Sequence, residues 1–185
     1  MIDCLNVSGR IITEDQQKAD VFNEQFNQIF SNCETLSQPE LNSNAPIMED
    51  IQCTEAEVLK LLKNVDISKA QGPDELAPCL LKEGEERLAP AFCKLFNLSL
   101  SSGVLPADWQ KANICPLYKK GNKQDPGNYR PISLTSITCK ILERIICKRL
   151  IEHFNENNIL CDNQHGFREK RSCETQLIEA INDWS

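Results

Sequence analysis

The sequence predicts a mostly helical α+β fold that contains one β-hairpin. Apolar residues recur at helical spacing in most of the chain, whereas one stretch has two short extended runs joined by a turn rich in Gly, Pro and Asp. The 185 residues are one domain's length, and 41% of them are hydrophobic and 25% charged. This composition is typical of a soluble globular protein and excludes disorder of the whole chain.

The first predicted helix covers residues 14–31. Thr13 and Gln16 have the spacing of a capping box, and the apolar residues that follow recur on one side of a helix. The stretch 36–50 contains prolines and asparagines and has little periodicity, which predicts a loop or linker.

Two further helices are predicted in the first half of the chain. Thr54 and Glu57 form a second capping box at the start of a short helix. A longer helix covers residues 85–102, and Gly103 is placed as its C-terminal stop. Between them, residues 66–74 break the helical pattern, because the Gly-Pro step in this stretch forces a turn.

The β-hairpin is predicted from two extended runs, residues 111–120 and 128–134. The seven residues between them are rich in Gly, Pro, Asn and Asp, which favour a turn. Pro116 and Pro131 lie within the runs, so both strands are expected at edge or irregular positions.

Helical spacing returns at residues 136–154, and Asn157 and Asn158 are expected to end this helix. A loop follows, and Ser172 is predicted to cap a last helix that reaches Trp184. The chain ends while this pattern continues, so we expect it to be a fragment of a longer protein.

Positive charge is concentrated in one part of the chain. The net charge is -7, but residues 111–150 hold nine Lys and Arg against two Asp and Glu, a net charge of +7. Lys119 and Lys120 at the hairpin tip and Arg130 at its base could clamp a triphosphate or a nucleic-acid backbone. From charge alone, a solvated surface without a ligand is an equally good interpretation.

The cysteines and histidines give little indication of a metal site. The ten cysteines are scattered and form no CxxC pair, so we predict that most are reduced, semi-buried small hydrophobes. His153, Cys161, His165 and Cys173 have ligand types that suit zinc, but their spacing favours ordinary packing. No secretory signal and no membrane-spanning apolar run is evident, so we expect an intracellular protein, in the nucleus or cytoplasm, without membrane contact.

A series of motifs in a fixed order carries a more specific signal. These motifs are Gly72-Pro73-Asp74, Leu95-Phe96-Asn97, Asn128-Tyr129-Arg130-Pro131-Ile132-Ser133-Leu134-Thr135-Ser136, Lys140-Ile141-Leu142-Glu143-Arg144 and Gln164-His165-Gly166-Phe167-Arg168. Together they resemble the reverse transcriptase of non-LTR (LINE-type, jockey-like) retrotransposons. The ordered match covers about residues 66–184.

This resemblance implies a right-hand polymerase fold. Residues 66–185 would be the fingers and the start of an incomplete palm, and residues 1–65 a helical N-terminal arm and linker. The implied partners are an RNA template, a DNA primer, deoxynucleotide triphosphates and the missing palm and thumb. The full-length family enzyme is expected to use Mg²⁺.

The resemblance also assigns roles to individual residues. Lys119 and Lys120 would approach the phosphates of the template or the incoming nucleotide, and Arg130 would bind the triphosphate. The template-contacting segment would comprise Gln164, Gly166, Phe167 and Arg168. In that segment, Gly166 would allow close backbone approach and Phe167 would pack under the templating base or its sugar.

Several of these residues also have ordinary structural interpretations. Phe167 fits a core position equally well, and His165 fits a hydrogen-bonded structural histidine better than an acid or base. Phe96 and Trp109 are predicted to belong to the core, and Tyr129 is predicted to pack.

Catalytic carboxylates are expected to be absent. Polymerases hold two divalent metals with clustered carboxylates, which the resembling family takes from palm positions beyond Ser185. The sequence has no Asp-Asp pair. We therefore predict that this chain has no catalytic and no metal-binding residue, and that alone it does not polymerise. The alternatives are a non-catalytic module that binds RNA or an RNA–DNA hybrid, and a relic without function.

A fingers region normally rests on the palm. We therefore expect Ile137, Ile141 and Ile145, which share one side of a predicted helix, to lack a covering surface.

Overall fold

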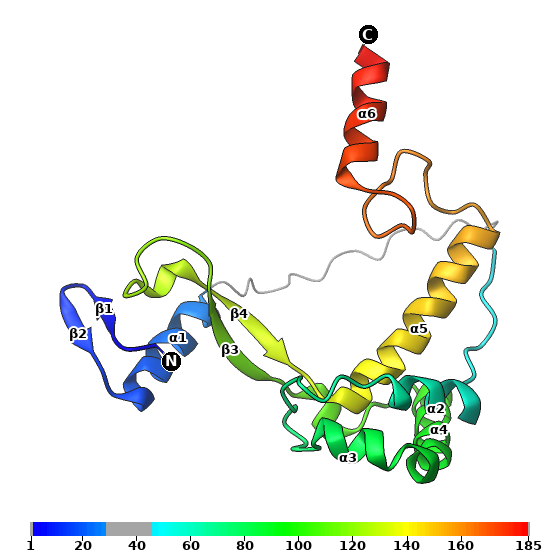
Figure 1. Ribbon diagram of the computed structural model, residues 1–185, viewed down its shortest axis with the longest axis horizontal. Helices are drawn as coiled ribbons and strands as arrows, with labels where there is room; N and C mark the ends of the chain where they lie inside the picture. The colour runs from blue at the N-terminus through cyan, green and yellow to red at the C-terminus, as the bar shows by residue number, and fades with distance from the viewer. Residues whose placement is uncertain (1, 29–45, 185) are drawn as a thin grey trace. The chain divides into compact units, whose positions relative to one another are not determined.

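The computed structural model describes residues 2–28 and 46–184 of the chain (Figure 1). The described residues form two compact units, one of residues 2–28 and 52–142 and the other of residues 46–51 and 143–184. The elements are β1 (Leu5–Val7), β2 (Arg10–Ile12), α1 (Asp15–Asn27), α2 (Glu55–Lys63), α3 (Pro78–Glu83), α4 (Glu85–Ser102), β3 (Asn113–Tyr118), β4 (Tyr129–Leu134), α5 (Ile137–Glu156) and α6 (Cys173–Trp184). Short 3₁₀ turns cover Ala107–Gln110 and Pro126–Asn128.

The structure agrees with the predicted α+β class, and helices cover more of the described residues than strands do. The prediction of a single hairpin is wrong. A second two-stranded antiparallel hairpin, β1–β2, lies at the N-terminus. Its two turn residues, Ser8 and Gly9, both have positive φ (52° and 88°), which is the geometry of a tight hairpin turn. The side chain of Asn6 accepts a hydrogen bond of 2.9 Å from the Gly9 amide and closes the turn.

Helix α1 follows β2 directly, and its predicted capping box is wrong. Glu14 is the N-cap, and it makes no side-chain cap. The side-chain amide of Gln16 donates instead to Asp20, one turn further along the helix, at 3.0 Å. It therefore does not bond the backbone at the start of the helix, as a capping box requires. The last part of the predicted helix, residues 29–31, lies outside the described residues, as does most of the predicted loop 36–50.

Helices α2 and α4 pack against each other and form the helical core of the first unit. The predicted cap of α2 is confirmed, because Thr54 Oγ1 accepts a hydrogen bond from the Glu57 amide at 3.2 Å. Gly103 ends α4 with a left-handed φ of 68°, as predicted. Phe96 is fully buried and its ring lies 5.7 Å from that of Trp109, which confirms both as core residues.

Asn97, next to Phe96 in the motif, joins α4 to the extended segment before α2. Its side-chain oxygen accepts from the Cys53 amide at 2.8 Å, and its nitrogen donates to the Cys53 carbonyl at 3.0 Å. One side chain therefore satisfies both backbone groups of a buried residue. Burial is also the main reason that the pKa of the adjacent Cys93 thiol is raised.

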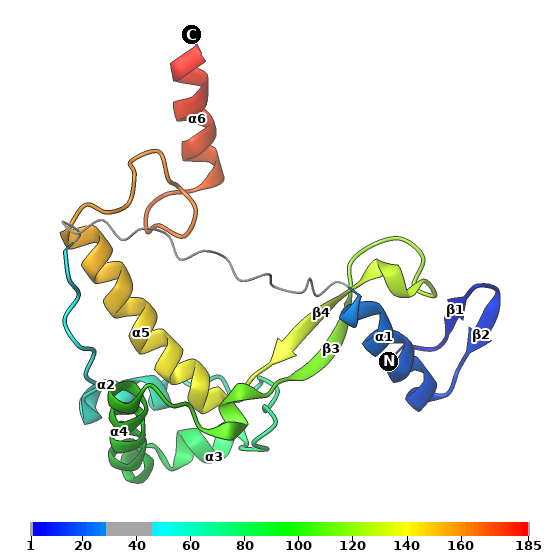
Figure 2. The ribbon, with the colours of Figure 1, turned by 180° about the vertical axis from the view of Figure 1, so that it is seen from behind.

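The predicted hairpin is confirmed as the antiparallel pair β3–β4. Leu117 pairs with Arg130, and Pro116 lies directly opposite Pro131. The hairpin leads through Thr135 and Ser136 into α5. Figures 1 and 2 both show β1, β2 and α1 beside the loop that joins β3 to β4, so the N-terminal segment belongs to the same unit as the hairpin. The division of the chain after residue 65 stays a prediction.

The Gly72-Pro73-Asp74 turn packs against the junction between β4 and α5. Gly72 approaches the backbone so closely that a Cβ atom there would lie 2.6 Å from the Ser136 nitrogen. The Asp74 carboxylate accepts a hydrogen bond from the Ser136 hydroxyl, which also lies 2.6 Å from the Thr138 hydroxyl. The other carboxylate oxygen of Asp74 is buried and has no hydrogen-bond partner among the described residues.

The apolar side of α5 is covered, contrary to expectation. Ile137, Ile141 and Ile145 are 8%, 2% and 1% exposed. The exposed apolar stripe lies instead on α6, where no residue is buried. It consists of Leu177, Ile178, Ile181 and Trp184. No helix among the described residues is long and apolar enough to cross a membrane.

Candidate nucleic-acid interface

The β3–β4 hairpin has two different faces. Side chains alternate along each strand, so the pairs Tyr118–Tyr129 and Pro116–Pro131 share one face. This inner face meets α1, where the Phe22 and Tyr129 ring centroids lie 5.0 Å apart in an edge-to-face contact. Tyr129 is 8% exposed and belongs to a cluster with four apolar residues, which confirms that it packs. The other members are Leu5, Ile12, Phe22 and Phe26.

The outer face of the hairpin carries two of the three predicted phosphate contacts. Arg130 lies opposite Leu117 on this face. The Lys119 amide donates to the Asn128 carbonyl at 2.9 Å, which continues the ladder by one pair and places Lys119 on the same face. Lys119 and Arg130 are therefore diagonal cross-strand neighbours, about 7–8 Å apart at Cα. Lys120 follows at the beginning of the turn and is exposed.

These cations are not neutralised by neighbouring acids. Within residues 2–28 and 46–184, no ion pair is formed by Lys119, Lys120 or Arg130, and all three side chains are exposed. By contrast, Lys111 in the same basic segment pairs with Asp108 at 3.8 Å. Unpaired surface cations on one face can approach an anionic ligand without first losing a partner.

We define the hairpin tip as residues 119–128, and internal hydrogen bonds give it a fixed shape. The Tyr129 hydroxyl donates to the Lys123 carbonyl at 2.7 Å, and the Tyr118 hydroxyl donates to the Gly121 carbonyl at 2.5 Å. Lys123 also lies over the Tyr118 ring, 5.6 Å from its centroid. Burial raises the pKa of the Tyr129 phenol, and the nearby Tyr118 and Asp3 raise it further.

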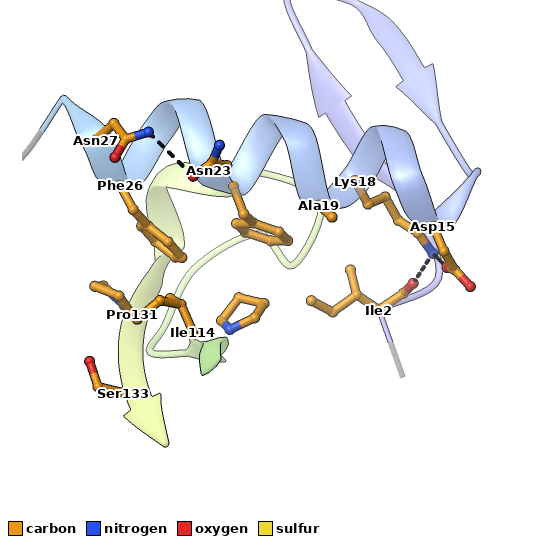
Figure 3. Close-up of a pocket in the computed structure, with 12 residues that line it drawn as sticks. Ile2, Asp15, Lys18, Ala19, Asn23, Phe26, Asn27, Ile114, Pro131 and Ser133 are labelled. Atoms are coloured by element: carbon orange, nitrogen blue, oxygen red, sulfur yellow. Dashed lines mark hydrogen bonds and ion pairs between the residues drawn. The ribbon is translucent and has the colours of Figure 1, made fainter. Parts of the chain in front are cut away.

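A cavity of about 590 Å³ lies between α1 and the inner face of the hairpin (Figure 3). Phe26, Ile114 and Pro131 form its apolar walls, and Asn23 and Asn27 lie along its helical side. Lys18 closes one end, where its ammonium group donates to the Ile2 carbonyl at 2.8 Å and pairs with Asp15 at 2.6 Å. None of the predicted phosphate contacts lines this cavity.

The predicted template segment lies in the second unit, as a loop before α6. Phe167 is fully exposed and has a φ of 61°, so its interpretation as a core residue is wrong. A bulky residue at positive φ is backbone strain of the kind found at functional sites. Gly166 has open space around it, with no atom within 4 Å of the position that a Cβ would occupy. Gln164 is exposed, and its side chain lies 3.5 Å from the Gly166 carbonyl.

His165 anchors this loop to α6. Its Nδ1 lies 2.7 Å from the Thr175 hydroxyl, and its Nε2 lies 2.8 Å from Glu179 and 3.1 Å from Arg171. The Thr175 hydroxyl donates to the Ser172 carbonyl, so it accepts from Nδ1 of His165. The prediction of a hydrogen-bonded structural histidine is confirmed. Arg168 also supports the loop, because its guanidinium donates to the Cys161 carbonyl at 3.0 Å.

The side chains that could bind a metal ion are spread over the described part of the chain. Among the described residues, no three His, Cys, Asp or Glu side chains gather closely enough to hold a metal ion, and this includes the group around His153 and His165. Within residues 2–28 and 46–184, these side chains therefore form no candidate site for Mg²⁺. The prediction that most cysteines are semi-buried is wrong, since five of the nine described are exposed. These are Cys79, Cys115, Cys147, Cys161 and Cys173.

Sequence reasoning missed two groups that support the hairpin. One is the N-terminal hairpin β1–β2, for which the Ser8-Gly9 turn was the available signal, together with the packing of the predicted helix α1 against Tyr129. The other is the bond between Asp74 and Ser136, both of which belong to the ordered motifs. The only sequence signal that Asp74 and Ser136 act together was that both lie in the same ordered series of motifs.

From the end of β3 onward, the chain is similar to a known protein family. A family model described as "Reverse transcriptase (RNA-dependent DNA polymerase)" matches residues 118–184. The match begins at the end of β3 and includes the hairpin tip, β4, α5, the loop with Phe167 and α6.

Three similar proteins of Drosophila melanogaster agree with this match. The probable RNA-directed DNA polymerase from transposon BS is 33% identical over 65% of this chain. The RNA-directed DNA polymerase from mobile element jockey is 30% identical over 68%, and the probable RNA-directed DNA polymerase from transposon X-element is 29% identical over 76%. The aligned parts make up only 14%, 14% and 15% of these relatives, so the chain spans a small part of their length.

Proposed function

From the premise that this chain belongs to the reverse transcriptase family of RNA-directed DNA polymerases from non-LTR retrotransposons, we propose that it is the fingers region of such an enzyme. In this role it contacts an RNA template and an incoming deoxynucleotide triphosphate beside a DNA primer. The palm and thumb that complete the enzyme would come from the rest of a longer polyprotein, inside the cell, in the nucleus or the cytoplasm.

The observation that carries this proposal is the pair of Lys119 and Arg130 on the outer face of the hairpin. Both are exposed and form no ion pair within the described part of the chain. A guanidinium matches phosphate oxygens with two parallel hydrogen bonds, and an ammonium group adds a point charge beside it. With Lys120 at the start of the turn, these side chains form a surface suited to a triphosphate or a phosphodiester backbone.

The loop 164–168 is proposed to contact the template. The fully exposed ring of Phe167 offers a stacking surface for a base, which is how single-stranded nucleic acids are commonly held. The open space around Gly166 lets a nucleotide approach the backbone, and the exposed amide of Gln164 can bond it. Arg168 contributes charge and also holds the loop through Cys161.

We propose that this chain alone does not extend a primer. Phosphoryl transfer needs clustered carboxylates that hold two divalent metals, and the described residues bring no such cluster together. The test is primer extension by the 185-residue protein on an RNA template with Mg²⁺. Incorporation of nucleotides would contradict the proposal, whereas binding without extension supports it.

The binding experiment measures affinity for a short RNA–DNA duplex at several salt concentrations. Affinity should fall steeply as salt rises, because several phosphate contacts release counterions. The combined Lys119→Ala, Lys120→Ala and Arg130→Ala variant should lose most of this affinity and most of its salt dependence. A matched control removes three exposed cations from helices elsewhere, by Lys60→Ala, Lys63→Ala and Lys94→Ala, and should bind like the wild type. Equal losses in both variants would mean that only net charge matters.

The alternatives give different results in the same experiment. A non-catalytic binding module would bind the duplex tightly. After the palm is supplied, it would still bind the duplex but would not support DNA synthesis. A relic without function would show no salt-dependent binding.

A further inference from the structure

The hairpin tip is held from outside by the N-terminal segment, residues 2–27. The Asn6 amide in β1 donates to the Gln124 carbonyl at 2.7 Å. The Gln124 side chain in turn lies 3.4 Å from the sulfur of Cys4. The tip therefore bonds directly to a segment more than one hundred residues earlier in the chain.

A second connection runs through Tyr129. Its ring packs against Phe22 of α1, and its hydroxyl donates to the Lys123 carbonyl at 2.7 Å. Lys123 and Gln124 are consecutive, so two neighbouring carbonyls of the tip are held by groups that belong to, or pack on, the N-terminal segment. These bonds fix the tip backbone between Lys120 and β4, where a sequence rich in Gly, Asn and Pro would otherwise adopt many conformations.

The N-terminal segment beside the basic tip is acidic, which bears on how the segment could affect binding. Residues 2–27 contain five Asp and Glu against two Lys and Arg, a net charge of -3. By charge alone, an acidic segment next to a basic tip weakens binding of a polyanion. A benefit to binding must therefore come from the shape that the segment imposes on the tip.

We propose that residues 2–27 position the hairpin tip for phosphate binding, and that Phe22 and Tyr129 are the positioning residues. This inference rests on the proposed function. Because the tip is ordered before the ligand arrives, binding does not have to supply the free energy of ordering it. Disrupting the contact should weaken binding even though no cation is removed.

The experiment uses two variants of the full chain and two measurements. Phe22→Ala removes the ring that packs on Tyr129, and Tyr129→Phe keeps that packing but removes the hydroxyl that holds Lys123. Amide hydrogen exchange of residues 119–128 is measured without ligand, and affinity is measured for a short RNA–DNA duplex. Exchange should become faster in both variants, and affinity should fall by about fivefold for Phe22→Ala and about threefold for Tyr129→Phe. Phe22→Leu should restore most of both properties.

A matched control separates positioning from general loss of stability. Val58 is fully buried in α2, which packs against α3 and α4, so Val58→Ala should lower stability without changing tip exchange or affinity. If Phe22→Ala fails to fold, Tyr129→Phe, which keeps the ring, still provides the test. Faster tip exchange with unchanged affinity, or unchanged tip exchange in both variants, would overturn the positioning role. A wild-type chain that does not bind the duplex would instead overturn the proposed function.

Discussion

The carboxylate of Asp74 accepts a hydrogen bond of 2.5 Å from the hydroxyl of Ser136, which lies 62 residues further along the chain. This bond joins the Gly-Pro-Asp turn to the residue that precedes α5. The Ser136 carbonyl accepts from the Lys140 amide, so Ser136 also starts the hydrogen-bonded ladder of α5. A carboxylate at the amino end of a helix is favoured by the helix dipole. The turn and the start of α5 therefore stabilise each other and fix where β4 ends.

Gly72→Ala should destabilise the first unit. A Cβ atom there would lie 2.6 Å from the Ser136 nitrogen and 2.7 Å from the Thr135 carbonyl carbon, and these backbone atoms cannot move aside easily. Overpacking of this kind costs about 1–3 kcal/mol of unfolding free energy. Urea denaturation followed by circular dichroism measures it. A variant as stable as the wild type would show that the junction between β4 and α5 can shift.

Gly166→Ala should leave stability unchanged and weaken template binding. No atom lies within 4 Å of the new Cβ position, and the φ of Gly166 is not in the left-handed region. A methyl group would therefore disturb only a ligand that approaches the backbone. We expect the affinity for single-stranded RNA to fall several-fold, with an unchanged thermal midpoint. Wild-type affinity in this variant would show that the template does not approach Gly166.

Ionisation of Tyr129 should destabilise the first unit at high pH. Burial raises the pKa of its phenol above the value in an unfolded chain, so the folded state holds this proton more tightly. The resulting stability is fully present below about pH 10, the ordinary pKa of tyrosine, and is lost as pH rises through the higher folded value. The chain has two tyrosines, so Tyr118→Phe leaves Tyr129 as the only one for titration by ultraviolet absorbance. Titration at the ordinary value would contradict burial of this hydroxyl.

The helix ends that could be predicted from the sequence depend on residues that are close together in the chain. Thr54 caps α2 and Gly103 ends α4 through bonds to residues a few positions away, so short sequence patterns are sufficient to find them. Thr13 has the same pattern and fails, because Gln16 bonds forward to Asp20. The spacing of a capping box therefore leads to a cap only where no other local hydrogen bond takes its place.

The features of the candidate site differ in whether the sequence could predict them. The position of Arg130 beside Lys119 follows from the register of one hairpin, which the turn residues and alternation indicate. The support of the tip by Asn6 and the bond between Asp74 and Ser136 join segments far apart in the chain, and no periodicity reveals such pairs. The exposure of Phe167 likewise depends on how the His165 network folds the loop, which a single sequence does not contain.

The pairing of Pro116 with Pro131 determines how the hairpin can associate with other chains. Lys119 and Asn128 are joined by a ladder hydrogen bond, so the alternation makes Pro116 and Pro131 a pair without hydrogen bonds between them, in which backbone groups point outward. Proline has no N–H, so each outer edge of the ribbon lacks a donor near its middle. Neither edge can accept a continuous third strand, and the ribbon is protected against edge-to-edge aggregation. Its partners must be recognised by side chains on its faces.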